Sequence, residues 1–227
     1  MFVDFMWQAC NECVRPRLQR TREPTAHQAA TLTELLHGDT RFEAGATVLE
    51  VGCGVGAQRV ILVENSPDAL ITSIDISPDS IDAARAKLSA LGRTNVEFRV
   101  ADIFDLSFQD ESFDHVLICF VLEHLADPVS ALRALRRVVK RGGSITLIEG
   151  DHGSTFFHPN SVLAQRAVRC QVELQARAGG NANIGRSLYP LLDAAGFGDV
   201  KVSPRLVCVD GSRPHLIEDS PATPSPP

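Results

Sequence analysis

The sequence predicts an α/β protein with a doubly wound, mostly parallel sheet. From residue 46 onward, short runs rich in β-branched residues alternate with helix-like stretches, the strand candidates being TVLEVGCG, ALITSIDIS, NVEFRVAD, SFDHVLICFVLEH and SITLIEGD. Strands that alternate with helices imply βαβ units, and right-handed crossovers then cover both faces of a parallel sheet. A glycine-rich turn after the first strand and an acid at the end of the second strand favour the same fold class.

The helices between these strands are marked by start and stop residues. PDSIDAARAKLSALG begins at a proline and ends at Gly92, and PVSALRALRRVVKRGG predicts a surface helix that continues to a glycine pair. This helix is expected to carry a solvated basic face, formed by Arg133, Arg136, Arg137, Lys140 and Arg141. SVLAQRAVRCQVELQARAGG predicts a long helix, LYPLLDAAGFG a short one, and DVKVSPRLVCVDG a late strand interrupted by Pro204.

Composition narrows the function classes. The chain has 227 residues, enough for one domain with a small appendage. Lys and Arg number 22 against 28 Asp and Glu, which gives a formal charge of −6. Since a net negative field does not favour binding to a polyanion, we expect no nucleic-acid partner.

Cysteine usage and hydropathy indicate the cellular setting. The six cysteines are widely scattered, and the C-x-x-C pair of Cys10 and Cys13 has no second pair or histidine cluster beside it. We therefore expect neither a disulfide framework nor a metal site. The sequence has no signal-peptide pattern and no run near the roughly 18 apolar residues of a membrane span. These features predict a cytoplasmic protein without a membrane partner.

The stretch VLEVGCGVGAQ is the most informative part of the chain. A strand runs into Gly52, Cys53 and Gly54 and then into a helix, so the backbone can pass close to a ligand at the strand's carboxyl end. By spacing alone, Gly52, Gly54 and Ala57 also fit the dinucleotide fingerprint G-x-G-x-x-A. Asp75 ends the next strand and suits the ribose hydroxyls of either kind of ligand, so this acid does not separate the two interpretations.

Glu50 distinguishes between them. It stands two residues before the first glycine, in the pattern E-x-G-x-G-x-G. A carboxylate at this position suits a ligand with an ammonium or sulfonium charge, because it would repel a pyrophosphate.

Several motifs resemble those of a known family and occur in the same order along the chain. VLEVGCGVGAQ, SIDIS, VADIFDLSFQDESFDHVLICFVLEHL and KRGGSITLIEG resemble the class I S-adenosylmethionine-dependent methyltransferases, especially the ubiquinone and menaquinone biosynthesis methyltransferase-like group. The resemblance is strong over about residues 45 to 150 and weak over 180 to 210. Arg141 departs from the proline that the family commonly has before the two glycines.

The resemblance implies a set of cofactor contacts. Gly52, Cys53 and Gly54 would face the methionine part of S-adenosyl-L-methionine, and Glu50 would orient its amino group. Asp75 would bind the ribose hydroxyls, and Ile76 would lie against the adenine. The remaining positions implied are Asp102 for the adenine amino group, Ile103 for one wall of the adenine slot, and Cys119 for the methionine side.

The same resemblance implies an N-terminal helical lid over residues 1–44 and the S-adenosylmethionine-binding methyltransferase domain over 45–211. The composition of residues 212–227, rich in Pro and Ser, predicts a disordered tail. Members of the fold usually complete the sheet with two further strands. Only one late strand is expected here, so the final strand is expected to be missing or formed by a fold-back at Pro204. A vacant position would leave an edge through which a homodimer could form.

The residues expected on the acceptor side follow the fourth and fifth strands. These loops supply an acid and imidazole cluster beside aromatic walls, formed by Glu123, His124, Glu149, Asp151, His152 and His158 with Phe156 and Phe157. His152 is the first candidate for a general base and His124 the second, because an imidazole has its pKa near neutral pH. Capping a turn or shaping the pocket is the ordinary alternative for either histidine.

The sequence thus predicts methyl transfer from S-adenosyl-L-methionine to a small-molecule acceptor. In-line displacement from a sulfonium needs alignment above all, and a base only for a protonated acceptor atom. The alternative hypotheses are a catalytically degenerate S-adenosylmethionine-binding or partner subunit and a nicotinamide-dependent oxidoreductase, with an RNA or protein methyltransferase ranking last.

Overall fold

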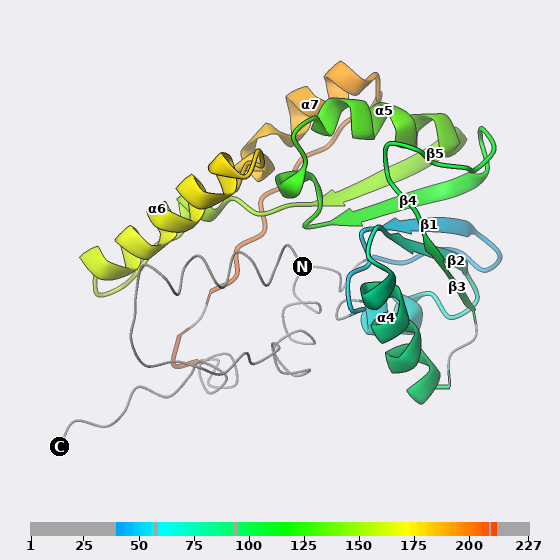
Figure 1. Cartoon of the computed structure of the whole chain (residues 1–227), viewed down its shortest axis with the longest axis horizontal. Helices are drawn as coiled ribbons and strands as arrows, with labels where there is room; N and C mark the ends of the chain where they lie inside the picture. The colour runs from blue at the N-terminus through cyan, green and yellow to red at the C-terminus, as the bar shows by residue number, and fades with distance from the viewer. Residues whose placement is uncertain (1–39, 57–58, 93–94, 209, 213–227) are drawn as a thin grey trace.

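Five parallel strands form one sheet in the order β3-β2-β1-β4-β5 (Figure 1). The computed structural model describes residues 40–56, 59–92, 95–208 and 210–212. The strands are β1 (Thr47–Val51), β2 (Leu70–Asp75), β3 (Val96–Val100), β4 (Phe113–Cys119) and β5 (Val139–Ile148). Each neighbouring pair is parallel. The predicted fold class and its five parallel strands are therefore confirmed.

Helices follow the strands at the positions that the sequence marks. The α-helices are α3 (Arg59–Asn65), α4 (Pro78–Ala90), α5 (Pro128–Val138), α6 (Val162–Arg177) and α7 (Leu188–Ala195), and the 3-10 turns are η1 (Leu122–His124), η2 (His152–Ser154) and η3 (Ile184–Ser187). Ser77 caps α4 by accepting a hydrogen bond from the Ser80 N–H, and Asp127 caps α5 in the same way. Both helices have proline in their first turn, where its missing N–H costs nothing.

Two hydrophobic clusters bind the helices to opposite faces of the sheet. Leu132 and Leu135 of α5 and Leu192 of α7 pack against the sheet residues Val116 and Ile118 in one cluster. The second cluster joins the α3 residues Leu62 and Val63 and the α4 residue Leu88 to Val48 and Ile71 of the sheet. Figure 1 shows α5 and α7 together on one side of the sheet, with α4 on the other. This three-layer arrangement leaves the strand ends free to carry a site.

The predicted helix over residues 128–143 is too long. It ends at Val138, and β5 begins at Val139, so Lys140 and Arg141 lie on the strand and not on the basic helix face. Between Val139 and Ser144 the strand is irregular, because Gly142 has a φ of +79° and the register with β4 shifts. The ammonium of Lys140 lies 2.9 Å from a carboxylate oxygen of Asp114 on β4, which ties the irregular stretch to its neighbour.

The predicted late strand over residues 199–211 is wrong for the part of it that the structure describes. Residues 201–208 form no strand, and the side chains of Val202 and Leu206 are exposed. Pro204 has no N–H to offer a ladder, which disfavours pairing here. Within the described ranges β5 pairs only with β4, so the sheet ends at this edge.

Two of the expected regions lie largely outside the described residues: the helical lid, apart from residues 40–44, and the tail, apart from residue 212. Among the helices that are described, none is long and apolar enough to cross a membrane.

Candidate functional site

The carboxyl ends of the strands bring the predicted site residues to one edge of the sheet. Gly52 follows β1, Asp75 ends β2, Asp102 follows β3, Cys119 ends β4 and Glu149 follows β5. The chain order of the strands reverses between β1 and β4, the position at which open parallel sheets bind ligands. In Figure 1 the arrowheads of β4 and β5 point toward the side of the molecule that carries α6.

The turn after β1 is held tightly to the neighbouring strands. Gly52 has a φ of +69°, and a Cβ added there would overlap the side chain of Val121 beyond β4. Gly54 also has a positive φ, of +48°, but a Cβ added there would meet nothing within 4 Å. Gly52 therefore serves close packing inside the protein, whereas Gly54 borders open space that a ligand can enter.

Four main-chain N–H groups of this turn are already bonded within the protein, those of Gly52, Cys53, Gly54 and Gly56. The Ile74 carbonyl accepts from Gly52 at 2.8 Å and from Cys53 at 3.0 Å. A carboxylate oxygen of Asp75 accepts from Gly54 at 2.8 Å. The Gly56 N–H donates to the Cys53 carbonyl at 3.1 Å. A pyrophosphate would need N–H groups of this kind, so the turn is poorly prepared for a dinucleotide.

Asp75 has a local role that the sequence did not reveal. While one of its oxygens accepts from Gly54, the other accepts from the Ser77 N–H at 2.9 Å. The carboxylate thus joins the glycine turn to the start of α4. The next side chain, Ile76, is 70% exposed and open to contact with a ligand.

Glu50 lies on β1 beneath the turn and is buried, with 8% of its surface exposed. The hydroxyl of Ser73 on β2 donates to its carboxylate at 2.6 Å. This carboxylate places negative charge at the base of the glycine turn, as the sequence pattern predicts.

The remaining predicted cofactor residues are divided between surface and core. Asp102 is exposed and accepts from the Phe104 N–H at 2.9 Å, which fixes the turn after β3. Ile103 and Cys53 are each 8% exposed, and Ile103 belongs to the core cluster beneath α5. Cys119 is partly buried at the end of β4. Ile103 therefore contributes mainly to the core, and its side chain offers little surface to a ligand.

The turn after β4 is organised by the carboxylate of Glu149, a role that the sequence did not reveal. One oxygen accepts from the N–H groups of Val121 at 3.0 Å and Leu122 at 2.8 Å, and the other accepts from Glu123 at 3.3 Å. Phe120, which leads into this turn, has a positive φ of 56°, an uncommon conformation for a residue with a side chain. Burial raises the pKa of Glu149 from 4.5 to about 7, and the charge of Glu123 adds to this rise, while the three N–H donors oppose it.

A second carboxylate, Glu123, holds both candidate histidines. It is 6% exposed, and one oxygen lies 3.3 Å from Nε2 of His152 while the other lies 3.4 Å from Nε2 of His124. The hydrogen bond to Glu123 raises the pKa of His152 above its usual 6.5, although burial opposes the rise. Sequence reasoning placed these three residues in one cluster but did not identify Glu123 as the group between the histidines.

His152 is bonded on both sides of its ring. Its Nδ1 lies 3.4 Å from Nε2 of Gln171 on α6, in addition to the Glu123 contact at Nε2. His124 is bonded on one side only among the described residues, through Nε2. The geometry therefore makes His152 a bridge between η1 and α6, and leaves Nδ1 of His124 as the more available nitrogen.

Asp151 and the aromatic side chains near the imidazoles are arranged differently from what the sequence predicted. Asp151 forms an ion pair with Arg186, 2.6 Å from Nη2, and this contact lowers the pKa of the carboxyl. Its partner is thus an arginine and not the adjacent His152. Phe156 is 87% exposed and Phe157 37% exposed, so they do not form the enclosed aromatic walls that the sequence suggested.

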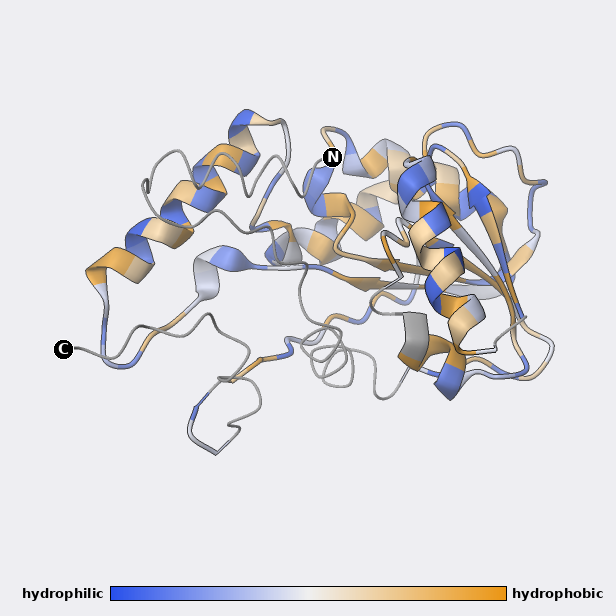
Figure 2. Ribbon diagram, turned by 60° about the horizontal axis from the view of Figure 1, so that its bottom comes forward, coloured by the Kyte–Doolittle hydropathy of each residue, from blue (hydrophilic) through white to orange (hydrophobic). Residues whose placement is uncertain are grey.

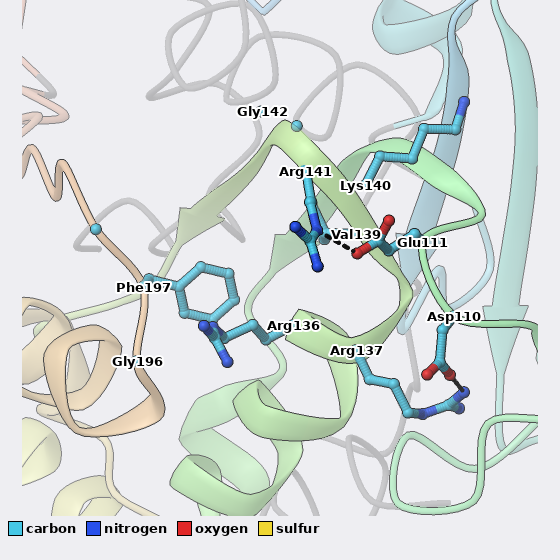
Figure 3. A pocket seen from close by; sticks show the side chains of 12 residues that line it. Asp110, Glu111, Arg136, Arg137, Val139, Lys140, Arg141, Gly142, Gly196 and Phe197 are labelled. Carbon is cyan, nitrogen blue, oxygen red and sulfur yellow. Dashed lines mark hydrogen bonds and ion pairs between the residues drawn. The ribbon is translucent and has the colours of Figure 1, made fainter.

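A pocket with a volume of about 560 Å³ lies at the other end of β5. Figure 3 shows Arg136, Arg137 and Arg141 around it, with Arg137 paired to Asp110 and Arg141 to Glu111. It is lined in part by Val139, the first residue of β5, and therefore lies away from the carboxyl ends of the strands. Within the described ranges no group of three His, Cys, Asp or Glu side chains is placed to hold a metal ion.

The fold and the site define a class of protein. A parallel sheet in the order 3-2-1-4-5, with a glycine turn after β1 and acids at the end of β2 and after β3, is the Rossmann-like methyltransferase arrangement. Residues 49–147 match the family model described as "Methyltransferase domain". Residues 49–147 therefore form a methyltransferase domain of the class I S-adenosylmethionine-dependent kind.

Similar sequences include a demethylmenaquinone methyltransferase of Listeria monocytogenes, 33% identical over 110 residues, which covers 48% of this chain and 46% of that protein. An uncharacterized methyltransferase of Schizosaccharomyces pombe is 33% identical over 147 residues, covering 62% and 52% respectively. The chain thus spans about half the length of the curated relatives that it matches.

Solved structures share the fold at low sequence identity. Phosphoethanolamine N-methyltransferase 2 of Haemonchus contortus, in complex with S-adenosyl-L-methionine, superposes with a TM-score of 0.57 at 16% identity, over 77% of this chain and 37% of that one. A SAM-dependent methyltransferase of Aquifex aeolicus has a TM-score of 0.54 at 21% identity, over 77% and 83% of the two chains.

The contact between Gly52 and Val121 yields a prediction for stability. Gly52→Ala should lower the free energy of unfolding by about 2 to 4 kcal/mol, because it adds both a positive-φ penalty and an overlap. Gly54→Ala should cost about 1 kcal/mol, since its Cβ meets open space. Adding Val121→Ala to Gly52→Ala should recover part of the loss in urea denaturation. A strictly additive double-mutant cycle would contradict the contact.

The raised pKa of Glu149 predicts how stability changes with pH. A carboxyl whose pKa rises from 4.5 to about 7 on folding stabilises the fold fully below pH 4.5, and this stabilisation is lost as the pH rises through about 7. Between about pH 5 and about pH 8 the loss should amount to about 2 to 3 kcal/mol. His152, whose pKa is also raised, adds a loss of the same sign.

Urea unfolding of Glu149→Gln over the same pH range checks this prediction. The amide keeps an acceptor for Val121 and Leu122 but does not titrate, so the decline should shrink to the share of His152. An unchanged decline in Glu149→Gln would show that another group is responsible.

Proposed function

We propose that this domain binds S-adenosyl-L-methionine and transfers its methyl group to a small-molecule acceptor. The observation that carries the proposal is the turn at Gly52–Gly54: open space lies beside Gly54, negative charge lies beneath it on Glu50, and its N–H groups are bonded within the protein. A ligand with ammonium and sulfonium charges suits such a turn. A nicotinamide dinucleotide, whose pyrophosphate would need free N–H groups, does not.

The residues present fit this cofactor. The main chain of Gly52, Cys53 and Gly54 would border its methionine part, with Glu50 below. Asp75 would accept from the ribose hydroxyls with the lone pairs that its two N–H bonds leave over, and the exposed Ile76 would lie against the adenine. Asp102, the main chain of Ile103, and Cys119 complete the proposed cofactor set.

The bound cofactor supplies an electrophilic methyl group on a good leaving group, so the main task of the protein is alignment. The turn after β4 would do this. Glu149 fixes its three N–H groups, and Val121 of the same turn packs on Gly52 of the cofactor turn. The positions of acceptor and methyl group would thus be set by one connected set of contacts.

For an acceptor that must lose a proton, we propose His124 as the first candidate base and His152 as the second. This reverses the order expected from sequence, because both ring nitrogens of His152 face protein groups whereas Nδ1 of His124 has no hydrogen-bond partner among the described residues. Glu123 would stabilise either imidazolium. Replacing these histidines would slow methyl transfer to acceptors that must lose a proton. It would have little effect on transfer to acceptors that are already nucleophilic.

A homodimer through the β5 edge stays a prediction. Among the described residues β5 pairs with β4 alone, so its outer backbone groups are available for strand addition.

Calorimetric titration tests the cofactor assignment. S-adenosylmethionine and S-adenosylhomocysteine should bind, and NADH should not. Gly54→Ala should weaken S-adenosylmethionine at least tenfold, because its Cβ fills the open space, while retaining nearly all of the stability. Asp75→Asn should weaken it about tenfold or more, as expected for a lost bond between a hydroxyl and a charged acceptor. Tight NADH binding with no response to the other two ligands would overturn the proposal.

Acceptor screening by S-adenosylhomocysteine release then tests transfer itself. His124→Gln and His152→Gln should be compared over a range of pH with an acceptor found in the screen. Replacing the residue that acts as the base is expected to lower kcat and to remove the acid limb of the pH profile. Release that survives both substitutions at every pH would exclude both histidines.

A further inference from the structure

Large apolar side chains are exposed at the beginning of α6 and in the loop before it. Phe156 is 87% exposed, Leu163 78% and Val162 71%, with Phe157 beside them at 37%. In Figure 1, α6 extends away from the sheet, and in Figure 2 its first turn has the colour of hydrophobic residues. We call these four residues the apolar tip. All four fall between residues 156 and 163, and large apolar side chains exposed so close together along a folded chain indicate an interaction surface.

The other half of α6 anchors the tip to the domain. Gln175 is 1% exposed, and its amide donates to the Glu123 carbonyl at 2.9 Å. Gln171, one turn earlier, reaches the ring of His152. Ser161 caps the start of the helix by accepting from the Ala164 N–H at 3.2 Å. The helix is thus fixed at its end and capped at its beginning, so the tip is presented on an ordered element.

Charge around the tip differs from that of the whole chain. The chain has a formal charge of −6, yet no Asp or Glu occurs from residue 152 to 172. Arg166 and Arg169 lie in this stretch on α6, both are exposed, and neither forms an ion pair within the described part of the chain. The surface therefore combines a projecting apolar group with positive charges immediately behind it.

We propose that the apolar tip docks on an anionic lipid surface. Phe, Leu and Val at the projecting end suit insertion at the boundary of headgroups and acyl chains, and the two arginines suit the negative headgroups above it. A nucleic acid is a poorer fit, because the outermost side chains are apolar and only two arginines accompany them. This proposal does not depend on the identity of the methyl acceptor.

Vesicle flotation of the full chain tests the docking. The wild type should bind vesicles containing about a third phosphatidylglycerol, should bind phosphatidylcholine vesicles at least about fivefold more weakly, and should lose binding as salt rises. The double variant Phe156→Ser/Leu163→Ser should lose about tenfold or more in binding to both. Arg166→Gln/Arg169→Gln should lose about fivefold per arginine on the anionic vesicles alone.

Matched controls lie away from the tip. Leu91 is 50% exposed at the end of α4, and Arg177 is exposed at the other end of α6. Leu91→Ser and Arg177→Gln should leave vesicle binding within about twofold of the wild type. Thermal unfolding and S-adenosylmethionine titration of each variant show that the fold and the proposed cofactor site are unchanged.

Three results would overturn the proposal. The first is an absence of binding by the wild type to anionic vesicles. The second is an equal loss in the tip variants and their controls. The third is a change of oligomeric state or of RNA binding in the tip variants without a change in vesicle binding, which would assign the tip to a second copy of the chain or to a nucleic acid. None of these readouts depends on methyl transfer.

Discussion

Where a parallel strand ends, the N–H groups of the following turn lose their ladder partners and must find others. In this domain side-chain carboxylates supply many of them. Asp75, at the end of β2, accepts from Gly54 in the turn after β1 and from Ser77 in its own turn. Asp102 accepts from Phe104 in the turn after β3. Glu149, after β5, accepts from three consecutive residues of the turn after β4. The shape of the whole ligand edge depends on these bonds, since each fixes a turn that no regular element holds.

This way of satisfying the backbone has an electrostatic consequence. The acceptors are acidic side chains gathered at one edge, and two more, Glu50 and Glu123, are buried close to it. In the glycine turn the N–H of Gly54 is occupied by Asp75, and those of Gly52 and Cys53 are occupied by the Ile74 carbonyl. Burial opposes this accumulation of charge, which is why Glu149 has a pKa of about 7 and holds a proton for part of the time near neutrality. Carboxylates at such an edge favour a cationic ligand, and the proposed cofactor carries sulfonium and ammonium charges of this kind.

How far the sequence predicted this structure depended on the range of the contacts. The five strands, the glycine turn and Asp75 could be read from local pattern, because periodicity and turn chemistry are properties of neighbouring residues. The end of α5 could not: Val138 closes the helix and Val139 opens β5 with no turn signal between them, and the glycine pair that suggested the helix end lies inside the strand. The prediction of a late strand was wrong for a similar reason. The apolar residues around Pro204 have the local pattern of a strand, but residues 201–208 form none.

The imidazole cluster shows the same limit at the site. Glu123, His124 and His152 were placed near each other because their loops follow adjacent strands. That Glu123 lies between the two histidines, and that Asp151 turns away to Arg186, depends on α6 and η3, which contact these loops from far along the chain. No local signal in the sequence specifies Gln171 or Gln175 as their partners.

The main chain at Glu123 makes the acceptor edge and α6 a single mechanical unit. Its carbonyl accepts from the Gln175 side chain at 2.9 Å and from the Asn181 N–H at 2.7 Å, while its own N–H is held by Glu149. Its side chain faces both histidines. A rotation of α6 would therefore have to move Glu123 or break these bonds, in a buried region where lost hydrogen bonds are costly. Val162 and Leu163 of the apolar tip lie on the same helix. Their orientation relative to the ligand edge is therefore fixed by the bonds that place His124 and His152, and a surface that binds them would meet the proposed acceptor side of the sheet in one defined geometry.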